Sequence, residues 1–205
     1  MGKLYAAKRN NLLKTTYYGG RPVLIIDPDK GPNEALQRLR TKYNPEAQDL
    51  LWSVWEDYSI FIPQRLHLAK KNDPEGVCTI APKEEKYRGA GIVFAPWNNY
   101  SPQHEIKRFC NLGLDGIPKF SRVNPYIYES LRLKHELTHA GGYRQENLAD
   151  MFAAAAGLIE FGREALPEVL IQSDIRAMAA LRNAETLACM DLWEDKTTPE
   201  IDYFN

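Results

Sequence analysis

The sequence predicts an α+β domain in which a small antiparallel sheet packs against a mainly helical region that carries an HExxH helix. Three observations lead to this class. Short apolar runs with strand character lie in the first half of the chain, longer segments with helical spacing surround them, and no Pro/Gly/Ser-rich linker interrupts the 205 residues. With 44% hydrophobic residues, the chain can bury a sizeable core. We therefore expect one domain over residues 22–193, preceded by a basic arm (1–21) and followed by an acidic, mobile tail (194–205).

The elements can be assigned in order from these patterns. Residues 22–27 read as a short buried strand, and residues 76–81 and 90–95 as two more strands, which the charged stretch 82–88 joins as a hairpin. Helical patterns are found at residues 33–43 and 45–58, then in the HExxH segment and the segment after it, and finally at 166–171 and 175–193.

Charge and cysteine usage exclude several classes of protein. A formal net charge of −1 gives no electrostatic reason to expect a nucleic-acid partner. No apolar run is long enough for a secretory signal or a membrane span. The three cysteines are widely scattered, which indicates reduced thiols in the cytoplasm and leaves export as an effector without a signal open. The basic residues of the N-terminal arm indicate a solvated segment: Lys3, Lys8, Arg9, Lys14 and Arg21.

The HExxH motif, residues 135–139, lies in a segment with clear helix boundaries. Asn124 can cap the helix and Pro125 suits its first turn, whereas Gly141 and Gly142 are typical of its end. Apolar residues fall on one broad face at helical spacing, and the ionisable residues occupy the remaining sector. The motif is therefore expected on an amphipathic helix.

This spacing points to a metal site. One helical turn separates His135 from His139, so both imidazoles project from the same face and can bind one cation. Zinc suits neutral imidazole ligands, and a site with three protein ligands keeps a position for water. Glu136 lies beside that position as a general base, so that the motif favours attack by zinc-bound water.

The third ligand is expected on the next helix. No histidine follows His139, and Gln145 stands where a downstream histidine ligand would be, so a downstream ligand must be a carboxylate or a weaker group. Glu146 and Asp150 share one face with small residues that let the two helices approach closely. We predict Glu146 as the ligand and Asp150 as the partner that orients a ligand histidine, with Asp150 as the alternative ligand.

Residues 131–158, with the HExxH motif and the segment that begins Glu146-Asn147-Leu148-Ala149-Asp150, resemble the glutamate-zincin metallopeptidases of the compact ImmA/IrrE type. This resemblance implies that His135, His139 and Glu146 are zinc ligands and that Glu136 is the general base. It also implies that Asp150 supports the ligands from outside the zinc site. It also implies that an extended substrate lies along an exposed sheet edge. The predicted edge strand comprises Ala90, Gly91, Ile92, Val93, Phe94 and Ala95.

The predicted function is a zinc-dependent hydrolase, in particular a metalloendopeptidase that acts on a protein or peptide substrate. Four residues are conceivable donors to the oxyanion of the transition state, and the spacing does not choose among them: Tyr143, Arg144, Tyr128 and His104. Two alternatives remain open. One is a hydrolase of non-peptide amides, and the other is a non-catalytic interaction or regulatory protein in which zinc only joins two helices.

Overall fold

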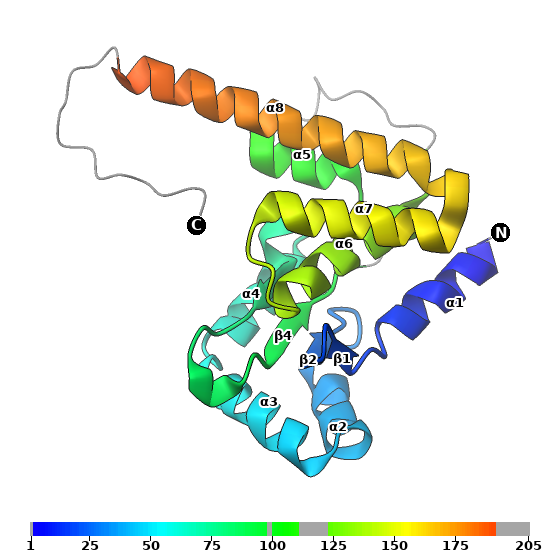
Figure 1. Ribbon diagram of the computed structural model, residues 1–205, viewed down its shortest axis with the longest axis vertical. Helices are drawn as coiled ribbons and strands as arrows, with labels where there is room; N and C mark the ends of the chain where they lie inside the picture. Colours follow the sequence, from blue (N-terminus) through cyan, green and yellow to red (C-terminus); the bar gives the residue numbers. More distant parts are fainter. Residues whose placement is uncertain (1, 98–99, 111–122, 192–205) are drawn as a thin grey trace.

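The computed structural model describes residues 2–97, 100–110 and 123–191. The chain forms a four-stranded sheet with helices on both faces (Figure 1). The elements are, in order, α1 (Gly2–Leu12), β1 (Tyr17–Tyr18), β2 (Arg21–Ile26), α2 (Pro32–Lys42), α3 (Pro45–Asp57), α4 (Phe61–Lys70), η1 (Pro74–Gly76), β3 (Cys78–Ile80), η2 (Glu85–Tyr87), β4 (Gly91–Phe94), α5 (Pro102–Cys110), α6 (Pro125–Ala140), α7 (Glu146–Phe161), η4 (Gly162–Ala165) and α8 (Leu166–Asp191).

The predicted α+β class is confirmed, but the sheet is mixed rather than antiparallel. The strand order is β1-β2-β4-β3, and β2 pairs with β4 in parallel, with Val23 opposite Gly91. A parallel pair needs a long crossover, and the chain between β2 and β4 provides it by forming α2, α3 and α4. The predicted hairpin is confirmed as β3 and β4, which pair antiparallel with Cys78 opposite Phe94.

Both faces of the two central strands are buried. Alternate residues such as Leu24 and Ile92 contact α2, α3 and α4, whereas Val23, Ile25 and Val93 contact α1 and α6. Figure 1 shows α2 and α3 on one side of the strands and α6 on the other. Because both faces of β2 and β4 are buried, their sequences are apolar throughout and do not alternate between apolar and polar residues.

The predicted substrate edge is wrong for the same reason. Within residues 90–95, Gly91–Phe94 form β4, which lies between β2 and β3 and is fully buried. Its backbone groups already pair with both neighbours, so no added strand can join it. The edge of the sheet on this side is β3, which is only half-buried along its length.

The solvated N-terminal arm is also a wrong prediction. Residues 2–12 form α1, which packs against α6, and Leu13 lies in the core between α1, the sheet and α6. Arg9 is buried, with its Nε 2.8 Å from Glu129 Oε2 of α6 and its Nη2 donating to the Pro96 carbonyl at 2.9 Å. A buried guanidinium of this kind requires such partners, and they tie the segment to the domain.

The remaining differences concern the other helices and the C-terminal tail. The sequence missed α4 and α5, and the two C-terminal patterns join into the single helix α8. The predicted acidic tail, residues 194–205, lies outside the described residues. Across the described ranges, no helix combines the length and the apolar content needed to cross a bilayer.

Candidate metal centre

The HExxH motif lies in the last turns of α6, which begins and ends as the sequence predicts. The Asn124 side chain accepts a hydrogen bond from the Tyr126 amide at 3.1 Å, and Pro125 occupies the first turn. The helix ends at Gly141, and Gly142 follows with φ +102°, a conformation that favours glycine. α6 is buried along nearly its whole length, between the sheet on one side and α7 on the other.

The helix α7 lies close against α6 because its inner face consists of small residues. Ala149, Ala153 and Gly157 are the buried residues of α7. At Gly157, an added Cβ atom would lie only 2.3 Å from Cδ2 of Leu131 on α6. The short turn at residues 141–145 reverses the chain and brings the first turn of α7 back to the end of α6, as expected from the two glycines.

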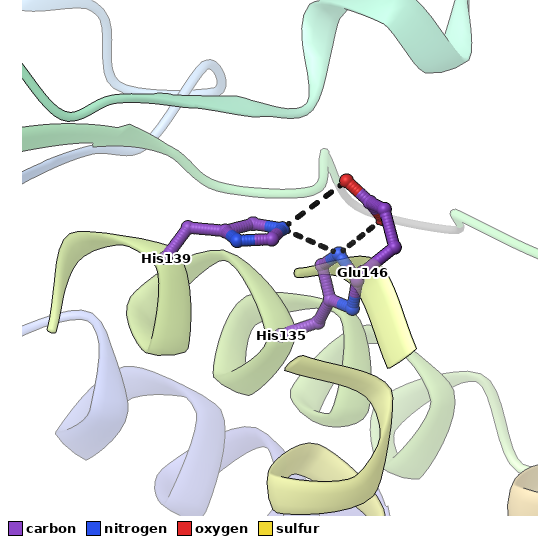
Figure 2. A group of neighbouring side chains, drawn as sticks. All are labelled: His135, His139 and Glu146. Carbon is purple, nitrogen blue, oxygen red and sulfur yellow. Dashed lines mark hydrogen bonds and ion pairs between the residues drawn. The ribbon is translucent and has the colours of Figure 1, made fainter. Parts of the chain in front are cut away.

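The structure brings His135, His139 and Glu146 together (Figure 2). The two Nε2 atoms lie 3.0 Å apart, His135 Nε2 lies 3.2 Å from Glu146 Oε2, and His139 Nε2 lies 3.4 Å from Glu146 Oε1. Four ligands placed tetrahedrally about 2.0–2.1 Å from a zinc ion lie about 3.3–3.4 Å from one another. The two Nε2 atoms and the two carboxylate oxygens of Glu146 are therefore close to the spacing that a tetrahedral cation requires of its ligands.

The other ring nitrogens determine which way the imidazoles face. His139 Nδ1 lies 2.8 Å from the Tyr143 carbonyl oxygen, and His135 Nδ1 lies 2.7 Å from Asp150 Oδ1. Since both neighbours are acceptors, the proton of each neutral ring belongs on Nδ1, and the lone pair belongs on Nε2. Two lone pairs and a carboxylate then converge on one point, an arrangement that is repulsive without a positive charge between them.

The pKa shifts agree with that electrostatic picture. Burial lowers the pKa of His139, but the hydrogen bonds that its ring donates to Glu146 and to the Tyr143 carbonyl, together with the nearby carboxylates of Glu136 and Glu146, outweigh burial and raise the pKa above its ordinary value. Partial burial raises the carboxyl pKa of Glu146, but hydrogen bonds from His135 and His139 hold it well below its usual range. The group of three side chains therefore favours a cation at its centre.

Asp150 lies behind His135 rather than at the centre of the group. Its Oδ1 atom faces His135 Nδ1, and its carboxylate also accepts hydrogen bonds from Gln172 and Arg176 of α8 at 2.8 Å each. Arg176 extends further and donates to Glu146 Oε2 at 2.9 Å. This geometry favours Glu146 over Asp150 as the third ligand and leaves Asp150 the orienting position.

Glu136 is buried beside the group, and two side chains hold its carboxylate. The Thr79 hydroxyl on β3 lies 2.8 Å from Glu136 Oε2 and also 2.8 Å from the Glu136 carbonyl oxygen. On the other side, Arg132 Nη2 lies 3.5 Å from Oε1. These contacts fix the direction of the carboxylate and join the edge strand to the end of α6.

A buried ionic network underlies the site. Arg132 lies one turn before Glu136 and is almost fully buried, with its Nε 2.5 Å from Glu105 Oε1 of α5. Glu105 also accepts hydrogen bonds from the Tyr128 and Tyr100 hydroxyls. Burial raises the pKa of Tyr128 well above its ordinary value, which keeps this phenol a donor. The network therefore braces α5 against the middle of α6.

The four predicted oxyanion donors have different positions. Tyr128 is fully buried with its hydroxyl on Glu105, so this prediction is wrong, because a substrate at the histidine pair cannot reach it. His104 lies on α5, with Nδ1 2.8 Å from the Ser101 hydroxyl and its ring stacked on Tyr100. Tyr143 and Arg144 are exposed in the turn after α6, and the Tyr143 ring packs on Phe152.

Sequence reasoning missed several residues that surround the motif. Arg132 could have been found, because it precedes Glu136 by four positions on a predicted helix. No spacing rule connects Thr79, Glu105 or Arg176 with the motif, since each comes from a distant element of the chain.

Comparison with known proteins adds no further information, because no family model, no curated protein and no solved structure matches this chain. The likeness of residues 131–158 to the glutamate zincins therefore depends on the HExxH motif and the segment that begins at Glu146.

Proposed function

We propose that this chain is a zinc-dependent hydrolase, and specifically a metalloendopeptidase that cleaves a protein or peptide substrate. The observation that carries the proposal is the convergence of His135, His139 and Glu146 at ligand spacing beside the buried carboxylate of Glu136. The resemblance of residues 131–158 to the ImmA/IrrE type of glutamate zincin supports the same activity. A zinc ion bound by these three residues would supply a Lewis acid and an acidified water molecule.

The protein residues around that centre have distinct roles in this proposal. Asp150 and the Tyr143 carbonyl hold the protons of the two imidazoles on Nδ1. Glu136 accepts a proton from the attacking water and returns it to the departing amine, while the Thr79 hydroxyl holds one oxygen of its carboxylate in place. Tyr143 and Arg144 remain the predicted donors to the oxyanion, because both are exposed next to His139.

The edge strand β3 replaces β4 as the proposed docking strand for substrate. Cys78–Ile80 lies at the end of the sheet, and its central residue, Thr79, contacts Glu136. An extended peptide that paired with β3 would therefore pass beside the proposed base. Such pairing uses backbone hydrogen bonds and tolerates many side-chain sequences.

A structural zinc is the main alternative, and the openness of the group argues against it. Structural zinc sites have four protein ligands, whereas the described residues contribute three, and the Glu146 side chain is 63% exposed. A cytoplasmic location also belongs to the proposal and depends on the scattered cysteines.

The test measures zinc by mass spectrometry and cleavage of an unbiased peptide library for the native chain and three variants. Glu146→Ala should lose zinc, and Asp150→Ala should lower its affinity by about 10- to 100-fold. Glu136→Gln should keep zinc and lose about 10²- to 10⁴-fold in cleavage rate. Glu56→Gln, an exposed change on α3, serves as the control and should behave as the native chain. Undiminished cleavage by Glu136→Gln contradicts the mechanism, and native chain without zinc contradicts the site.

A further inference from the structure

The outer face of α7 is apolar and largely exposed, although the Phe152 ring packs on Tyr143. Five positions between residues 148 and 161 are exposed, and all five are apolar: Met151, Phe152, Ala155, Leu158 and Ile159. We call this set the α7 stripe. Ile159 is 87% exposed and Met151 is 63% exposed, whereas the apolar side chains of the core are almost completely buried. Exposed apolar side chains that gather on one helix face mark an interaction surface rather than scattered surface residues.

The α7 stripe is symmetric about its smallest residue. Met151 and Ile159 lie four positions on either side of Ala155, and Phe152 and Leu158 lie three positions on either side. Ala155 therefore belongs to both rows of side chains that run along the stripe, the row with spacing four and the row with spacing three. A helix that crosses at Ala155 can approach closely there and meets large apolar side chains on both sides of the crossing.

A second copy of α7 has the matching shape. Rotation by 180° about an axis through Ala155 places Met151 of one copy against Ile159 of the other, and Phe152 against Leu158. The small residue then meets its own counterpart at the crossing point. The two helices run antiparallel, so that their dipoles attract.

The charges near the stripe also fit a second copy. The acidic residues of α7 within this stretch are Asp150 and Glu160, and both side chains point away from the stripe. Asp150 contacts His135 and Arg176, and Glu160 contacts Lys134. No like charges would therefore meet across a symmetric contact. α7 has no lysine or arginine, which a helix that binds a lipid surface generally has on its polar face.

We propose that the chain forms a symmetric dimer through the α7 stripe, with Ala155 on the two-fold axis. A standard interface buries about 800 Å² on each partner, and five side chains on one helix provide on the order of half of that area, so we expect a weak association. This dimer does not depend on the metal or on hydrolysis.

Sedimentation velocity of the full chain at about 5–300 µM, a range that reaches the concentrations at which weak interfaces associate, tests the proposal. The native chain should shift from monomer to dimer, and Ile159→Asp should weaken the association at least about tenfold, because it places two carboxylates in the contact. The matched control is Ile60→Asp, since Ile60 lies before α4 and is 78% exposed. It should leave the dimer unchanged.

Cross-linking locates the axis independently. In a chain whose three cysteines are replaced by serine, Ala155→Cys should form a disulfide-linked dimer on mild oxidation, because two residues on the axis lie within disulfide range, and Ile60→Cys should not. A native chain that stays monomeric overturns the proposal, as does a dimer that survives Ile159→Asp. Flotation of the monomer with phosphatidylcholine vesicles, abolished by Ile159→Asp, would assign the stripe to lipid instead and also overturns it.

Discussion

Zinc should stabilise the folded chain, because the geometry of the site favours binding to the folded state, and the size of the effect follows from the zinc concentration relative to the Kd. The unfolded chain cannot hold the donor atoms of His135, His139 and Glu146 3.0–3.4 Å apart, so the cation binds the folded state preferentially. At a free zinc concentration of 100 times the Kd, this preference adds about 2.7 kcal/mol to the free energy of unfolding. For a domain of this size, each kcal/mol raises Tm by about 2–4 °C, so Tm should rise by about 5–11 °C.

The assay is thermal unfolding monitored by circular dichroism, with chelated protein and with zinc added. His139→Ala should reduce the rise in Tm to less than about 2 °C, because two ligands bind zinc far more weakly than three. His67→Ala, which removes an exposed histidine on α4, should retain the full rise. Magnesium should not replace zinc, since it prefers six oxygen ligands. An equal rise in His139→Ala and in the native chain would refute the assignment of the ligands.

Three further predictions concern the packing around the site. Gly157→Ala should destabilise the chain by about 1–3 kcal/mol in urea unfolding, because its Cβ would lie 2.3 Å from Leu131 Cδ2; an unchanged or higher stability would show that α7 can shift. Arg132→Met should cost about 3–5 kcal/mol, because it removes the cationic partner of the buried Glu105 carboxylate and leaves it the Tyr100 and Tyr128 hydroxyls, and a loss below 1 kcal/mol would argue against this network. Burial raises the pKa of Tyr43 to about 12 in the folded chain. The protonated phenol therefore contributes about 2–3 kcal/mol to the free energy of unfolding, a contribution that is complete below pH 10 and disappears between pH 10 and 12. Tyr43→Phe should lack this alkaline loss of stability in pH-dependent unfolding.

Local sequence signals determined the helix that carries the motif. Asn124, Pro125 and the two glycines act within a few residues of the helix ends, so the boundaries of α6 follow from short-range interactions. The spacing of His135 and His139 is likewise a property of one helix. The small residues of α7 also predicted its close approach to α6, since their effect depends only on side-chain size.

Tertiary structure alone decided the sheet order and the residues that surround the site. The apolar run at 90–95 indicated a strand, but an apolar strand has the same composition whether one or two neighbours pair with it, so its central position was not visible. The contacts of Thr79, Glu105 and Arg176 join segments far apart in the chain, and these depend on how whole elements pack. Periodicity describes which face of an element is apolar, whereas the partner of that face is chosen by the shape and charge of the rest of the domain.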